Sequence, residues 1–119
     1  MTEVRNRDSA EAFTTLDGST IRVLLDARFG GAFKQSLAEA TLAPAAGTRR
    51  HYHARTEEIY VVLAGAGRME VDGDVREVGP GDAVLIPPGA WHEIVAGAEE
   101  LRFLCCCAPQ YSDEDTFFE

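Results

Sequence analysis

The sequence has 119 residues, of which 45% are hydrophobic and 26% are charged. This composition is typical of one globular domain and excludes a disordered chain. Eleven Lys and Arg against twenty Asp and Glu give a formal net charge of −9. That balance argues against partners with a phosphate backbone or an anionic membrane surface. No apolar run approaches the ~18 residues of a transmembrane helix. We therefore expect neither nucleic acid nor a membrane as a partner.

The N-terminal residues 1–12 are polar and lack the apolar core of a secretory signal, so they predict a loosely held arm. Short β-type runs then alternate with Gly, Pro and Asp turn signals, among them the hairpin signal Asp72-Gly73-Asp74. The predicted strands cover residues 19–25, 35–42, 58–63, 68–71, 75–78, 83–86, 91–95 and 101–107. Eight short strands at this spacing indicate an all-β sandwich or barrel.

A single domain over residues 1–119 is expected, with a barrel core over about 17–109. Residues 110–119 are acidic and predict either a tail or a short helix capped by Ser112. The three cysteines are consecutive, Cys105, Cys106 and Cys107. Neighbouring strand residues point to opposite faces, so this block is no disulfide framework and favours a reducing, cytoplasmic setting. Which of the three thiols faces inward stays open.

All three histidines of the chain lie near strand starts. His51 and His53 are two residues apart, a spacing that puts both imidazoles on one face of a strand. The carboxylates of Glu57 and Glu58 follow, and His92 begins a later strand. Three imidazoles and one carboxylate are a ligand set for one divalent transition metal, such as Fe, Mn, Zn, Ni, Co or Cu.

Residues 47–96 resemble the two motifs of the cupin superfamily. The first reads GTRRHYHARTEEIYVVLAG and the second reads GDAVLIPPGAWHEIVA. Two turn positions depart from the family pattern: the first glycine would fall at Ala45, and Ala96 stands where the family has asparagine. The resemblance implies a double-stranded β-helix, or jelly-roll, barrel that forms homodimers and binds Fe, Mn or Zn foremost. The metal ligands that it implies are His51, His53, Glu58 and His92.

Glu58 is preferred to Glu57 because only Glu58 leaves six residues before Gly65. If Glu58 points inward, strand alternation places Tyr60 and Val62 beside it. The phenol of Tyr60 is then a candidate proton donor, with barrel packing as the alternative. Trp91, Arg49 and Arg50 are candidates for contact with a substrate, with solvated or core-covering roles as the alternatives.

Three hypotheses for the function follow. The first is a non-haem oxygenase of the dioxygenase type, because four protein ligands leave one or two coordination positions open. The second is a metal-assisted isomerase, lyase or cyclase that acts on a sugar or polyketide-like molecule. The third is a ligand-binding module without catalysis. One carboxylate beside a dication leaves the site at about +1, which favours an anionic or enolisable small molecule.

Overall fold

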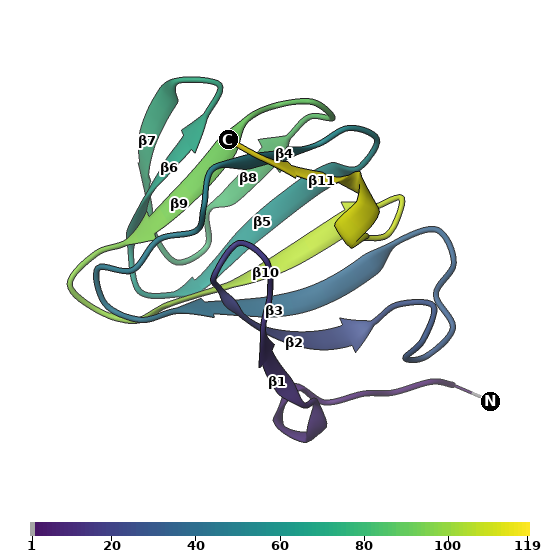
Figure 1. Ribbon diagram of the computed structural model, residues 1–119. Helices are drawn as coiled ribbons and strands as arrows, with labels where there is room; N and C mark the ends of the chain where they lie inside the picture. Colours follow the sequence, from purple (N-terminus) through teal and green to yellow (C-terminus); the bar gives the residue numbers. More distant parts are fainter. Residues whose placement is uncertain (1) are drawn as a thin grey trace.

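The computed structural model describes residues 2–119, which form eleven strands and two short 3₁₀ helices (Figure 1). The helices are η1 (Arg7–Ser9) and η2 (Asp113–Asp115). The strands are β1 (Ala12–Thr14), β2 (Thr20–Leu25), β3 (Ser36–Leu42), β4 (His51–His53), β5 (Glu57–Ala64), β6 (Gly67–Val71), β7 (Asp74–Val78), β8 (Ala83–Ile86), β9 (His92–Ala96), β10 (Leu101–Ala108) and β11 (Thr116–Phe118). None of the helices in the described residues has the length and apolar character needed to cross a bilayer.

The strands form two antiparallel sheets that face each other. One sheet has the order β1-β2-β3-β10-β5-β8 and the other β11-β4-β9-β6-β7. The inner faces meet in a core whose largest fully buried side chains include Phe103, Met69, Ile86, Ile94 and Leu101. This arrangement confirms the predicted all-β jelly-roll fold. Since β10 is hydrogen-bonded on both sides, by β3 and β5, it offers no free edge for pairing with a second copy.

Strand alternation orients the inward side chains as the sequence predicts. On β5 the side chains of Glu58, Tyr60 and Val62 are buried, while Glu57, the first residue of the strand, is exposed. On β9 the buried side chains of His92 and Ile94 are both 0% exposed. Two strands from opposite sheets therefore present polar side chains to the same apolar interior.

The turns at two motif positions show why the family favours glycine there. Gly65, between β5 and β6, has a φ of 78°, and a Cβ at this position would collide with the carbonyl group of Glu100. Ala45 stands where the first motif has glycine, and it adopts the left-handed φ of 64°. The backbone thus keeps the family's turn at Ala45 although the residue differs.

Both chain ends pack against the barrel. In the N-terminal arm, Arg7 pairs with the buried carboxylate of Glu39 at 2.7 Å, and Arg5 Nε donates to the carbonyl oxygen of Leu24 at 2.6 Å. Residues 110–119, for which a tail and a short helix were both open, form η2 with Ser112 as its N-cap, followed by β11. The short helix capped by Ser112 is thus the alternative that forms, and in place of a free tail Thr116–Phe118 pair with β4 as a strand of the second sheet (Figure 1).

Candidate metal centre

The three histidines converge inside the barrel. His51 and His53 share the inner face of β4, and His92 at the start of β9 pairs directly with His51 across the sheet. The ring centroids lie 4.2 Å apart for His51 and His92, and 5.4 Å apart for His53 and His92. One nitrogen from each ring lies within 4.8 Å of the other two. The spacing predicted from the sequence therefore brings three buried imidazoles to one point.

Glu58 reaches the same point from the opposite sheet. Its Oε1 atom lies 3.2 Å from Nε2 of His53 and 3.4 Å from Nε2 of His92. The neighbouring Glu57 is exposed, as expected from the strand alternation. All four side chains that the resemblance implies as ligands therefore meet at one place.

Backbone carbonyl groups fix the proton on two of the rings. Nδ1 of His51 lies 2.7 Å from the carbonyl oxygen of Arg49, and Nδ1 of His92 lies 3.0 Å from that of Ala90. A carbonyl oxygen only accepts hydrogen bonds, so each Nδ1 carries the hydrogen. In the neutral ring, Nε2 then carries a free lone pair that faces the interior.

The third ring is fixed by a residue from the end of the chain. Nδ1 of His53 lies 3.1 Å from Oγ1 of Thr116, and this hydroxyl donates its own hydrogen to the carbonyl oxygen of Ser112 at 2.9 Å. Oγ1 therefore accepts from His53, so this ring is also protonated on Nδ1. Sequence reasoning missed Thr116, because no local pattern links it to a histidine 63 residues earlier.

These groups fit a divalent cation. Glu58 Oε1 and His92 Nε2 are buried and have no hydrogen-bond partner among residues 2–119. With the three Nδ1 hydrogens already committed, lone pairs of nitrogen face an anionic oxygen, and such an arrangement is unfavourable without a positive charge between them. Three imidazole nitrogens and one carboxylate oxygen are the donor set that Zn, Fe, Mn and similar metals take. The metal that the family implies therefore suits the residues present.

The pKa shifts of Glu58 and His51 favour the protonation states that bind a cation. Burial raises the pKa of Glu58, but hydrogen bonds and positive charge from the His53 and His92 rings, whenever Nε2 carries a proton, outweigh that effect and bring the pKa to about 2; a cation between these groups lowers it in the same way. Burial, followed by the neighbouring His92, lowers the pKa of His51. An ionised carboxylate and an unprotonated imidazole are the forms that bind a metal.

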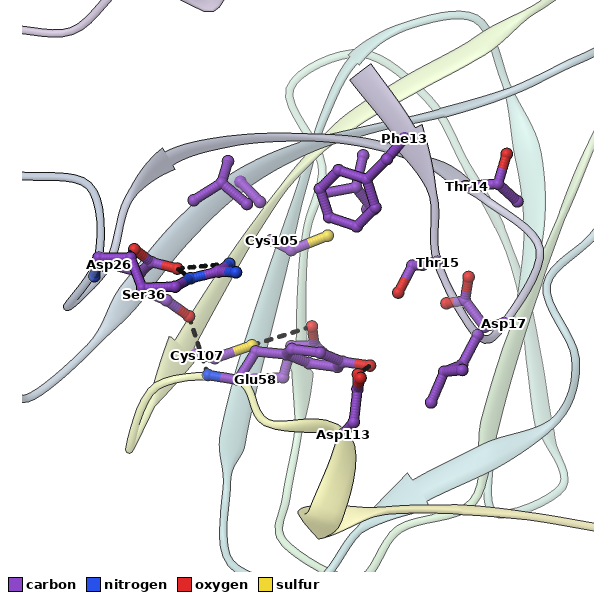
Figure 2. Close-up of a pocket in the computed structure, with 16 residues that line it drawn as sticks. Phe13, Thr14, Thr15, Asp17, Asp26, Ser36, Glu58, Cys105, Cys107 and Asp113 are labelled. Carbon is purple, nitrogen blue, oxygen red and sulfur yellow. Dashed lines mark hydrogen bonds and ion pairs between the residues drawn. The ribbon is translucent and has the colours of Figure 1, made fainter. Parts of the chain in front are cut away.

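A cavity of about 320 Å³ lies between the inner face of the first sheet and the C-terminal segment (Figure 2). Its buried end is formed by Glu58 and Cys107, with Cys105 beside them. The remaining lining residues come from β1 and the turn after it, from β2, β3 and the loop between them, and from the segment before β11: Phe13, Thr14, Thr15, Leu16, Asp17, Ile21, Val23, Asp26, Arg28, Ser36, Ala38, Tyr111 and Asp113. Glu58 thus belongs both to the histidine cluster and to the cavity.

The charged side chains of the cavity walls are mostly acidic. Arg28 is the single basic residue that lines it, and its guanidinium pairs with Asp26 at 3.1 Å. Asp17 accepts hydrogen bonds from Ser19, and Asp113 accepts one from the hydroxyl of Tyr111 at 2.9 Å, but neither has a cationic partner within the described residues. The walls therefore favour groups that donate hydrogen bonds.

The consecutive cysteines are divided between the two faces of β10. Cys107 is 2% exposed, and its Sγ lies 3.2 Å from Oε2 of Glu58, while Cys105 lines the cavity. Cys106 points to the other face, toward Gln35. Of the two registers that the sequence left open, Cys105 and Cys107 are the inward pair.

Tyr60 is buried in the core. Its ring centroid lies 4.7 Å from that of Phe103 and 6.1 Å from that of His92, and Tyr60 is not among the residues that line the cavity. Burial, followed by the charge of Glu58, raises the pKa of its hydroxyl well above the usual value. The phenol therefore keeps its proton.

The other side chains considered for substrate contact lie outside the cavity lining. The Trp91 ring packs against Tyr52, with centroids 4.7 Å apart, and the guanidinium of Arg50 lies over it at 5.2 Å. Arg50 also pairs with Glu70 at 2.7 Å, and Arg49 lies over the ring of Phe118. These contacts are between protein side chains.

Comparisons with known proteins agree with the geometry. Residues 38–107 match the family model described as Cupin domain. The chain is 44% identical over 110 residues to an uncharacterized protein of Methanocaldococcus jannaschii, covering 92% of this chain and 88% of that protein. It is 41% identical over 64 residues to the dimethylsulfoniopropionate lyase DddW of Ruegeria pomeroyi, covering 54% of this chain and 41% of the lyase.

Among solved structures, the polyketide cyclase RemF of Streptomyces resistomycificus superposes with a TM-score of 0.79 at 29% identity, covering 97% of this chain and 89% of the cyclase. The two motifs, the jelly-roll barrel, the buried histidine cluster and these matches lead to one assignment: the chain belongs to the cupin family.

Proposed function

We propose that this chain is a mononuclear metal-dependent enzyme that acts on a small enolisable molecule, as a lyase, isomerase or cyclase. One observation carries the proposal: three buried histidines converge, and Glu58, whose Oε1 lies 3.2 Å from Nε2 of His53 and 3.4 Å from Nε2 of His92, also lines the buried end of a cavity of about 320 Å³. When bound there, a divalent metal supplies Lewis-acid stabilisation for negative charge that develops on a substrate oxygen.

The residues of the chain have separable tasks in this proposal. His51, His53, His92 and Glu58 hold the metal, and the apolar walls from Phe13, Ile21 and Val23 exclude water from the bound molecule. The hydroxyl of Tyr60 keeps its proton because its pKa is raised, but Tyr60 lies outside the cavity lining, so its role as a proton donor stays a prediction.

The charges along the cavity walls narrow the class of substrate that we expect. Near the metal, the net positive charge favours an oxygen that becomes anionic. Farther out, Asp17 and Asp113 accept hydrogen bonds and repel anions, and Arg28 is already paired. We therefore propose a molecule with an enolisable carbonyl at one end and hydroxyl or amino donors at the other.

Two relatives with named activities support this class. RemF is named a polyketide cyclase and DddW a lyase, and neither kind of reaction requires an oxidant.

The oxygenase hypothesis remains a second candidate, since three imidazoles and a carboxylate also suit Fe(II). A ligand-binding module without catalysis would show affinity with no turnover. The homodimer that the resemblance implies stays a prediction, which sedimentation velocity checks.

The first experiment tests the metal centre itself. The protein is purified without chelators or nickel resin, and its metal content is measured by elemental analysis beside His51→Ala, Glu58→Gln and the matched control Glu57→Gln. We expect about one equivalent in the wild type and in Glu57→Gln, and far less in the other two variants. Less than about one-third of an equivalent in wild type, without loss in His51→Ala, would contradict the proposal.

The second experiment tests the reaction class. Protein loaded with Zn(II) or Fe(II) is incubated without O₂ in D₂O with hydroxy-ketones and amino-ketones, and deuterium uptake at carbon is followed by NMR. Exchange with either metal supports proton abstraction assisted by a Lewis acid. Turnover that needs both Fe(II) and O₂ would instead favour the oxygenase.

A further inference from the structure

The thiol of Cys107 lies against the carboxylate of Glu58. The two residues are direct partners in the antiparallel pairing of β10 with β5, and both point into the barrel. Cys107 Sγ lies 3.2 Å from Oε2 of Glu58, as the dashed line in Figure 2 shows. Cys107 is 2% exposed and Glu58 is 4% exposed, so water competes little with this contact.

The two oxygens of Glu58 therefore have different neighbours. Oε1 faces Nε2 of His53 and of His92, and it has no hydrogen-bond donor among residues 2–119. Oε2 accepts from the Cys107 thiol, the one side-chain donor that the described residues give it. A thiol is a weak donor, but an ionised acceptor strengthens the hydrogen bond.

We propose that Cys107 is a positioning residue that holds Glu58 in a one-oxygen binding mode toward the metal. This inference rests on the proposed metal centre. With Oε2 engaged by sulfur, the carboxylate presents Oε1 alone to the imidazoles. A second carboxylate oxygen on the metal would occupy a coordination position, so the thiol keeps that position open for a substrate oxygen.

The neighbouring cysteines supply an internal comparison. Cys105 lies on the same face and lines the cavity, but its thiol makes no hydrogen bond to Glu58 in residues 2–119. Cys106 lies on the opposite face, with its Sγ 3.9 Å from the amide oxygen of Gln35. One thiol of the three is thus placed to orient the carboxylate.

The test uses the full chain loaded with Co(II), whose visible absorption changes with coordination number. The variants are Cys107→Ser, which keeps a donor, Cys107→Val, which keeps the approximate volume without a donor, and the control Cys106→Ala. Each is first checked for folding by circular dichroism. Affinity for Co(II) is then measured by competition with a chromophoric chelator.

We expect Cys107→Val to change the Co(II) spectrum and to weaken binding about 10- to 100-fold, as loss of a group that orients a ligand does. Cys107→Ser should restore both, and Cys106→Ala should match the wild type. A folded Cys107→Val variant with wild-type spectrum and affinity overturns the inference. A sulfur-to-cobalt charge-transfer band in wild type that vanishes in Cys107→Ser also overturns it, because the thiol would then be a ligand itself.

The two failures are distinguishable. If wild-type protein takes up no Co(II) at all, the metal centre is wrong and this inference fails with it. If wild-type protein binds one equivalent and only the variants behave otherwise than expected, the metal centre stands and the role of Cys107 fails.

Discussion

Thr116 accepts a hydrogen bond from Nδ1 of His53 at 3.1 Å, although the two residues lie 63 positions apart. The Thr116 hydroxyl is itself oriented by the carbonyl oxygen of Ser112. Orientation of one imidazole of the candidate metal centre thus depends on the last strand of the described chain. Groups that accept from a metal-binding histidine fix its tautomer and raise its basicity.

We predict that Thr116→Val weakens metal binding by about 10- to 100-fold, because Nδ1 of His53 loses its hydrogen-bond acceptor. Thr116→Ser keeps the hydroxyl and should bind metal like the wild type. The exposed Thr20 provides the control, as Thr20→Val should have no effect. Chelator competition measures all four proteins, and equal affinity in Thr116→Val would show that the hydrogen bond does not matter.

Asp115 anchors the same segment. Its carboxylate accepts from the backbone amides of Arg55 and Thr56 at 3.1 Å each. Burial raises the pKa of Asp115, but these amide donors outweigh it and hold the pKa below the ordinary value of 3.8. Its stabilising effect is therefore present above pH 3.8 and is lost as the pH falls through the folded-state pKa.

We predict that Asp115→Ala lowers the free energy of unfolding at neutral pH by about 1–3 kcal/mol, because it leaves the buried amide of Thr56 without an acceptor. Urea unfolding measures the change. The exposed Glu114 lies in the same helix, so Glu114→Ala should cost little. Equal stability losses in the two variants would speak against an anchoring role for Asp115.

The metal-free protein should lose stability on acidification. The pKa of folded His51 lies below its ordinary value of 6.5, because of burial first and of His92 next. Below pH 6.5 the unfolded chain therefore binds a proton that the folded chain does not bind, and the free energy of unfolding falls as the pH drops. We expect His51→Gln to show a shallower decline in urea unfolding between about pH 7 and about pH 5. Parallel declines would count against a lowered His51 pKa.

The proposed role of Tyr60 has a direct test. Tyr60→Phe removes the hydroxyl and keeps the ring that packs on Phe103. If Tyr60 donates a proton during the reaction, kcat falls by about 100-fold or more while metal content and stability stay unchanged. Steady-state kinetics on the compound that exchanges fastest in D₂O measure this. An unchanged kcat would leave Tyr60 with a packing role alone.

Much of the barrel and the site could be predicted because both rest on short-range patterns. The two-residue spacing of His51 and His53 fixes a shared face, and the six residues between Glu58 and Gly65 distinguish Glu58 from Glu57. The structure brings these side chains together with His92. The predicted runs over residues 35–42 and 101–107 likewise correspond to β3 and β10, each within one residue at one end.

The rest depended on long-range pairing. Three consecutive cysteines carry no alternation of polar and apolar residues, so only the pairing of Cys107 with Glu58 decides which thiols face inward. Strand β11 follows an acidic segment and has only three residues, too short a run to predict from the sequence, and it is paired with β4 in the structure. Thr116 enters the site through that pairing alone.

The pairing of β11 with β4 has a consequence for the chain end. A metal bound at Nε2 of His53 favours the tautomer with the hydrogen on Nδ1, and Thr116 accepts a hydrogen bond from that atom. Cation binding and the docking of residues 112–118 are therefore thermodynamically linked. Loading the protein with metal should slow the trimming of its carboxyl terminus by an exopeptidase. Conversely, trimming that passes Thr116 should release the ion.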